Sequence, residues 1–188
     1  MFNVWFTSDT HFGAERTLKL SKRPFENVEE MNKKLIENWN KVVGVDDVVY
    51  HLGDFGDYEF ANQLNGHIRL VIGNYERRDI NLGIDFNDKF EFIYKEDFQT
   101  IWTELYNEKN RLTTTYKITM SHEPSFVRNV PIGPTEINLF GHVHKLSMVK
   151  RYGLNVGVDC HNFYPISLED VLHYHNAILN FYDEEVFD

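Results

Sequence analysis

Seven side chains of metal-binding type recur along the chain in short polar groups, each directly after an apolar run. Aspartate oxygen and neutral imidazole nitrogen are common protein ligands of zinc, manganese and iron, and asparagine adds an amide oxygen. Unrelated histidines would not be expected to follow an apolar run each time. The pattern therefore predicts a metal centre, and its candidate ligands are Asp9, His11, Asp54, Asn74, His122, His142 and His144.

Two ions held by such a set would favour hydrolysis of phosphate esters. Ions about 3.5–4 Å apart clamp phosphoryl oxygens and acidify a shared water, so that a metal-bound hydroxide forms near neutral pH. A carboxylate has two oxygens, and Asp54 after Gly53 is the candidate bridge between the ions. Ser8, Thr10 and Ser121 lie beside candidate ligands, but no triad marks them as nucleophiles, so we interpret them as hydrogen-bonding support.

The elements that must position these residues are strands ending at one edge of a sheet. Apolar runs at residues 2–8, 47–52, 68–72, 112–120 and 137–140 predict strands, and each leads into a candidate ligand group. Ligands collect at the carboxyl ends of strands in α/β sheets. Gly53, Gly73 and Gly141 precede ligands, and we expect them to let the backbone turn tightly.

Further elements follow from periodicity and turn residues. Apolar residues at helical spacing predict a helix over 28–43 with Asn27 as its N-cap. Residues 98–106 and 112–120 predict a hairpin around 107–110, and residues 149–152 and 154–158 predict a second one around Gly153. Ser167 is expected to cap a last helix that runs to about His175.

Composition limits the class of protein. A chain of 188 residues suits a single domain over 1–188. Its net charge of −10 argues against strong nonspecific nucleic-acid binding. A nucleotide substrate is still compatible with this charge, because bound metal would supply positive charge. Cys160 is the lone cysteine, so no intrachain disulfide is expected. Because we find no signal peptide or membrane-spanning run, we expect a cytoplasmic protein without a membrane partner; an oligomer stays open.

Five motifs, in their order and spacing, resemble those of the calcineurin-like metallophosphoesterases, especially the small bacterial and phage members. The motifs are SDTHFG at 8–13, HLGDFGD at 51–57, GNYE at 73–76, SHEP at 121–124 and GHVH at 141–144, and YPISLEDVL at 164–172 resembles the C-terminal segment of small members. The resemblance implies a four-layer α/β/β/α sandwich with two mixed sheets and two divalent ions. Manganese is the metal that we expect, with iron, zinc and nickel as alternatives.

The resemblance also implies how the ligands divide between the two ions. One ion would be held by Asp9, His11, Asp54 and His144, and the other by Asp54, Asn74, His122 and His142. Asp54 would thus bridge them, as its two oxygens already indicated.

Two positions depart from the family pattern. Tyr75 stands where GNH supplies a histidine, and Ala14 stands where many small members carry another. An acid–base imidazole is worth about 10²–10⁴-fold in rate, and a phenol is a poorer acid at pH 7 than imidazolium. Tyr75 would instead donate a hydrogen bond to a phosphoryl oxygen, which gives three candidate catalytic residues: Asp54, Asn74 and Tyr75.

The residues support a phosphodiesterase acting on a nucleotide-like or small organic phosphodiester, because loss of the acid hurts a monoesterase with a poor leaving group most. Two alternatives remain open. One is a phosphomonoesterase acting on nucleotides or phosphoproteins. The other is a catalytically weakened metal-binding scaffold, which Tyr75 alone favours.

Other charged and aromatic residues have two interpretations each. The candidate substrate-binding residues are Arg77 and Arg78. They either bind a phosphate or stand at the start of a solvated helix. A solvated segment is favoured over a basic lip for Arg16, Lys19, Lys22 and Arg23. Core packing is favoured over base stacking for Phe12, Phe55 and Phe163. We interpret His51 as support for the ligands, and expect loop or surface positions for His67, His161, His173 and His175.

Overall fold

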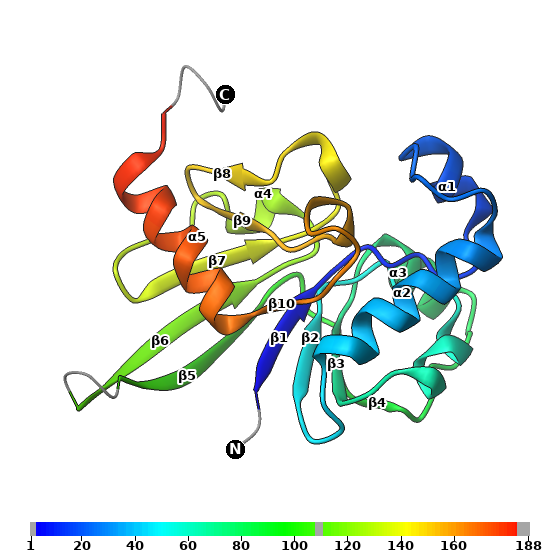
Figure 1. The fold of residues 1–188 in the computed structure, drawn as a ribbon, viewed down its shortest axis with the longest axis horizontal. Helices are drawn as coiled ribbons and strands as arrows, with labels where there is room; N and C mark the ends of the chain where they lie inside the picture. The colour runs from blue at the N-terminus through cyan, green and yellow to red at the C-terminus, as the bar shows by residue number, and fades with distance from the viewer. Residues whose placement is uncertain (1–2, 108–110, 184–188) are drawn as a thin grey trace.

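Four short parallel strands form the frame of the first sheet (Figure 1). The computed structural model describes residues 3–107 and 111–183. The strands are β1 (Val4–Thr7), β2 (Val48–His51), β3 (His67–Val71) and β4 (Phe90–Tyr94), and β10 (Ile166–Ser167) pairs antiparallel with β1. β2 is buried at every position, as expected for a parallel strand covered on both faces.

The second sheet has the strand order β5-β6-β7-β9-β8 and is also mixed. β5 (Gln99–Asn107) and β6 (Leu112–Met120) form the predicted hairpin, whose residues 108–110 lie outside the described part of the chain. β7 (Glu136–Phe140) pairs parallel with β6, and β9 (Gly153–Asn155) pairs parallel with β7. β8 (Val149–Lys150) closes the edge antiparallel to β9.

Helices connect and cover these sheets. The α-helices are α1 (Glu15–Leu20), α2 (Val28–Val42), α3 (Asn74–Asn81), α4 (Pro124–Val127) and α5 (Leu168–Phe181). Short 3₁₀ segments are η1 (Tyr58–Gln63), η2 (His144–Leu146) and η3 (Val158–Cys160). Figure 1 shows α2 running along the first sheet and α5 lying beside the second. No described helix combines the length and the apolar character needed to cross a bilayer.

Two cores hold the sandwich together, because strands of the first sheet send alternate residues to opposite faces. Val49 joins the core that α2 covers with Leu35 and Trp39. Tyr50, its neighbour in β2, joins the second core with Met120 of the other sheet and residues of α5. The predicted α/β sandwich with two mixed sheets is therefore confirmed.

Several boundaries differ from the sequence predictions. The last helix reaches Phe181 rather than His175, because Ile178 on its next turn packs into the second core. The second hairpin is shorter than predicted, and Val158 lies in η3 instead of a strand. The predicted start of the first strand at Phe2 lies outside the described residues. The Asn27 cap is confirmed, since its side chain accepts from the Glu30 N–H at 2.8 Å.

Candidate metal centre

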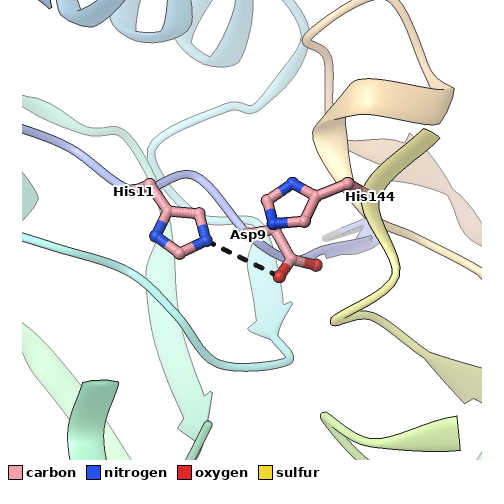
Figure 2. A group of neighbouring side chains, drawn as sticks. All are labelled: Asp9, His11 and His144. Atoms are coloured by element: carbon pink, nitrogen blue, oxygen red, sulfur yellow. Dashed lines mark ion pairs between the residues drawn. The ribbon is translucent and has the colours of Figure 1, made fainter. Parts of the chain in front are cut away.

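The candidate ligands lie together where strands of both sheets end. Asp9 and His11 follow β1, Asp54 follows β2, Asn74 begins α3 after β3, His122 follows β6, and His142 and His144 follow β7. Ligand atoms lie within 4.8 Å of one another in two groups, which are Asp9 with His11 and His144, and Asp9 with Asp54 and His122. Figure 2 shows the first group, in which Asp9 and His11 from the segment after β1 meet His144 from the segment after β7. The Asn74 amide nitrogen joins the cluster 3.3 Å from His142 Nδ1.

The interior of the cluster contains polar atoms that no group in the described part of the chain satisfies. Asp9 Oδ1 and both ring nitrogens of His11 are buried without a hydrogen-bond partner among the described residues. His11 Nε2 lies 3.8 Å from Asp9 Oδ1 (Figure 2) and 3.5 Å from Asp54 Oδ2. Leaving such an atom unsatisfied costs about 1–3 kcal/mol. These donors fit a divalent cation, which would satisfy carboxylate oxygen and imidazole nitrogen together.

The protonation state of His11 also fits metal binding. Burial lowers its pKa well below the ordinary value, and the nearby Arg23 guanidinium lowers that pKa further. His11 is therefore neutral at pH 7, with a free nitrogen lone pair. A neutral imidazole is the form that coordinates a metal ion.

Hydrogen bonds orient two further histidines of the cluster. His122 Nδ1 lies 2.8 Å from the Leu52 carbonyl, to which it donates. His144 Nδ1 lies 2.7 Å from the Asp159 carboxylate. In each ring a protonated Nδ1 leaves Nε2 as the nitrogen available to an ion, in the manner of histidine ligands held by a carboxylate or carbonyl.

A buried ion pair that the sequence analysis missed supports this geometry. Arg23 donates to Asp159 at 3.0 and 2.8 Å and to the carbonyls of Asp9 and Thr10 at 2.6 and 2.9 Å. Burial raises the pKa of Asp159, but the hydrogen bonds of His144 and Arg23 bring it down to about 2. The expectation of a solvated segment was wrong for Arg23. Its guanidinium pairs with the Asp159 carboxylate, which the fold brings from a distant part of the sequence.

Glu76 is a second supporting residue to which the sequence analysis assigned no role. Its fully buried carboxylate accepts from the backbone N–H groups of Asp54, Phe55 and Gly73 at 2.8, 2.8 and 2.7 Å. It thereby joins the turn after β2 to the turn after β3. The signal was present in GNYE, because Glu at the third helical position is typical of a side chain that reaches back to the helix start.

Several candidate ligands share an unusual backbone conformation. Asp9, His11, Asp54, His142 and His144 have φ values of 58, 50, 56, 71 and 48°. This left-handed region is sparsely populated by residues other than glycine, and such residues cluster at functional sites. Gly53 has φ of 84°, and a Cβ there would lie 2.5 Å from the Gly73 nitrogen. The turn that carries Asp54 therefore requires glycine beside it.

The candidate catalytic and substrate residues after β3 lie in different surroundings. The Tyr75 N–H donates to Asp54 Oδ1 at 2.9 Å, and its ring meets His11 edge-on with centroids 4.7 Å apart. Arg78 lies over the Tyr75 ring, 4.7 Å from its centroid, and pairs with Asp79 at 2.7 Å. Arg77 pairs with Asp97 at 2.6 Å.

The remaining aromatic and hydroxyl residues divide between core and support. Phe12 and Phe55 are buried in the first core, and Phe163 packs edge-on against Phe25. Buried His51 has its Nε2 2.9 Å from Thr10 Oγ1, on the loop between Asp9 and His11. The side-chain hydroxyls of Ser8, Thr10 and Ser121 each donate a hydrogen bond to a backbone carbonyl near the cluster.

The expectation of loop or surface positions was wrong for His175, whereas His161 lies in the turn after η3 but is not exposed. His161 is buried with its Nε2 2.7 Å from the Asn155 carbonyl. His175 is buried on α5 with its Nε2 2.7 Å from the Gly133 carbonyl. The fold brings the Gly133 carbonyl to His175 across 42 positions of the sequence, whereas Asn155 is only six positions from His161. His67 and His173 are exposed, although both lie on regular elements rather than on loops.

The chain is similar to proteins of one family. The family model for the calcineurin-like phosphoesterase superfamily domain matches residues 2–162. An uncharacterised protein of Methanocaldococcus jannaschii is 32% identical over 182 residues, covering 90% of this chain and 89% of that protein. The gene 66 protein of Mycobacterium phage L5 is 35% identical over 85 residues, covering 40% of this chain and 41% of that protein. The solved structure of a protein of unknown function from Aquifex aeolicus shares the fold, with a TM-score of 0.61 and 22% sequence identity. The match covers 93% of this chain and 100% of that protein.

Replacing Glu76 tests its role as the link between two turns. Glu76→Gln turns one acceptor oxygen into an NH₂ group that faces backbone N–H donors. We expect a loss of about 1–3 kcal/mol in the free energy of unfolding, measured by urea denaturation, and weaker Mn²⁺ binding in calorimetric titration. The exposed Glu59→Gln is the matched control. Equal behaviour of the two variants would contradict this role.

Asp159→Asn tests the buried ion pair between Arg23 and Asp159 through the pH dependence of the free energy of unfolding. Because the folded pKa of Asp159 is about 2, against an ordinary value of 3.8, its ionised form stabilises the fold above pH 4, and this stabilisation is lost as pH falls toward 2. In metal-free protein we expect a deficit of about 3–5 kcal/mol at pH 7, since Arg23 loses its partner. The deficit should shrink between pH 4 and 2 in urea denaturation. The exposed Asp46→Asn should show no such trend, and a pH-independent deficit would refute this account.

Proposed function

The chain belongs to the calcineurin-like phosphoesterase superfamily, whose members are metal-dependent phosphoester hydrolases, and from that premise we propose that it is a phosphodiesterase. The proposed substrate is a nucleotide-like or small organic phosphodiester. The observation that carries the proposal is the cluster of buried, unsatisfied ligand atoms on Asp9 and His11 beside Tyr75.

The proposed ligand set follows the division that the family resemblance implies. Asp9, His11, Asp54 and His144 hold one ion, and Asp54, Asn74, His122 and His142 hold the other. The group of Asp9, His11 and His144 supports the first set; the other group brings Asp54 and His122 of the second set together with Asp9. Manganese is proposed as the ion, and iron, zinc or nickel would also fit the carboxylate, amide and imidazole donors. A cytoplasmic location is also proposed, since the single cysteine gives no reason for an oxidising compartment.

In the proposed mechanism the protein positions both metal and ester. When bound, the ions supply positive charge to the phosphoryl oxygens and acidify a shared water. The Asp54 carboxylate is held by the Tyr75 N–H, which keeps Oδ2 directed toward His11 and His122, 3.5 Å from each. Tyr75 packs against His11, and its phenol donates a hydrogen bond to a phosphoryl oxygen.

Diester chemistry is favoured over monoester chemistry by what lines the cavity. The cavity of about 370 Å³ over the cluster contains three histidines, His11, His142 and His144, and each is a candidate metal ligand. No described histidine of this cavity is therefore left to protonate a leaving group. Loss of such an acid slows hydrolysis of a monoester with a poor leaving group most, so the lining of the cavity favours a phosphodiester.

Two chromogenic substrates test the proposal. With Mn²⁺ we expect faster turnover, in kcat/KM, of bis-p-nitrophenyl phosphate than of p-nitrophenyl phosphate. Asp54→Ala should abolish both activities, since it removes the proposed bridge. Asp46→Ala, on the exposed surface, is the control. Preference for the monoester would favour the phosphomonoesterase, and absence of both activities with metal bound would leave the scaffold.

Variants at Tyr75 test the proposed hydrogen bond. Tyr75→Phe should lower kcat for the diester by about 2–10-fold, the value of one hydrogen bond of about 0.5–1.5 kcal/mol. Tyr106→Phe, an exposed residue of β5, should change nothing. Tyr75→His separates two interpretations of this position. Turnover close to that of the unchanged protein supports a working site built around Tyr75, whereas a large gain would show that Tyr75 weakens catalysis.

A further inference from the structure

Two cavities meet at Tyr75 and Arg16. The first, which we term the metal-side cavity, is the one of about 370 Å³ that contains the candidate ligands. The second cavity, of about 500 Å³, is lined by residues such as Gly13, Asp57, Arg78 and Ile84 and by none of the candidate ligands. Tyr75 and Arg16 line both cavities, so they stand at the boundary between the two spaces.

We propose that the second cavity is a substrate compartment, and that the substrate is a phosphodiester whose two organic groups lie on either side of Tyr75. This inference rests on the phosphodiesterase function proposed above. A phosphodiester carries an organic group on each side of its phosphorus, whereas a monoester carries one. Two adjacent cavities that share Tyr75 and Arg16 beside the candidate ligands therefore match the shape of a diester.

Arg16 has the free charge that this boundary requires. It is exposed on α1, and its guanidinium makes no hydrogen bond or ion pair with any residue in the ranges 3–107 and 111–183. By contrast, Lys19 on the same helix pairs with Glu15 at 2.7 Å, and Arg77 pairs with Asp97. A free guanidinium binds phosphoryl oxygens in a bidentate fashion. We assign the phosphate contact to Arg16, which the sequence analysis treated as part of a solvated segment.

The linings of the cavities indicate different organic groups. Leu20 and Leu146 line the metal-side cavity and are 68% and 87% exposed, so they offer apolar surface to a planar or apolar group. The second cavity combines apolar surface, such as that of Ile84, with the Asp57 carboxylate and the Arg78 guanidinium, which suit a ring that bears polar groups. The substrate class is thus a diester that joins a planar or apolar group to a ring that also carries polar groups.

Filling the second cavity tests its occupancy. Ile84 lines it and is 45% exposed, so Ile84→Trp adds bulk there without opening a core. We expect KM for bis-p-nitrophenyl phosphate to rise at least fivefold, because both of its groups are large. Leu82→Trp is the matched control, since Leu82 is 67% exposed at the end of α3 and lines neither cavity. An unchanged KM in Ile84→Trp would overturn the proposal.

Removing the boundary charge is an independent test that needs no added bulk. Arg16→Met keeps the length of the side chain and should raise KM for the diester about tenfold, with a weaker salt dependence. Lys19→Met, on the same helix, should leave KM unchanged. Equal kinetics in Arg16→Met and Lys19→Met would overturn the assignment of Arg16.

Methyl p-nitrophenyl phosphate separates failure of this inference from failure of the proposed function. The unchanged protein should hydrolyse this small diester more slowly than the one with two large groups. If it hydrolyses both equally well, the phosphodiesterase stands and the second compartment falls. If it hydrolyses neither diester with Mn²⁺ bound, the proposed function falls and this inference falls with it.

Discussion

The site depends on one buried carboxylate, that of Glu76. Its two oxygens accept three backbone N–H groups, from the turn after β2 and the turn after β3. Backbone N–H groups buried without such acceptors would destabilise both turns. Because Asp54 lies in the first turn and Asn74 follows the second, this single side chain sets the distance between ligands that come from different strands. The cluster is thus positioned by backbone contacts as much as by its own side chains.

The same region carries backbone strain that the surroundings must offset. Five of the candidate ligands adopt left-handed conformations, each costing about 1–3 kcal/mol. Arg23 contributes to the compensation by donating to the carbonyls of Asp9 and Thr10. The Asp9 carboxylate accepts the His142 N–H at 2.9 Å and so joins the two sheets at their ends. Metal would add to this stabilisation, because it would satisfy buried atoms that find no partner within residues 3–107 and 111–183.

The sequence predicted what depends on local pattern and missed what depends on long-range pairing. Strand ends and candidate ligands were readable because apolar runs stop at polar residues, and the Asn27 cap was readable from three neighbouring positions. Arg23 and Asp159 are 136 positions apart, so no periodicity connects them. The length of α5 depends on Ile178 reaching the second core, which local pattern does not encode. The helix α1 was missed, and α3 was indicated only as a possible solvated helix at Arg77 and Arg78, because both helices are short and mostly polar.

Tyr75 can differ from the family's histidine without disturbing the metal ligands, and the reason lies in the backbone. Its N–H, rather than its side chain, holds Asp54, and any residue except proline supplies that donor. The side chain is therefore free to vary while the cluster keeps its geometry. What changes is the boundary between the two cavities, where the phenol ring packs between His11 and the Arg78 guanidinium. The proposed selection of substrate at position 75 would thus be separable from the geometry of the candidate ligands, because the two use different parts of one residue.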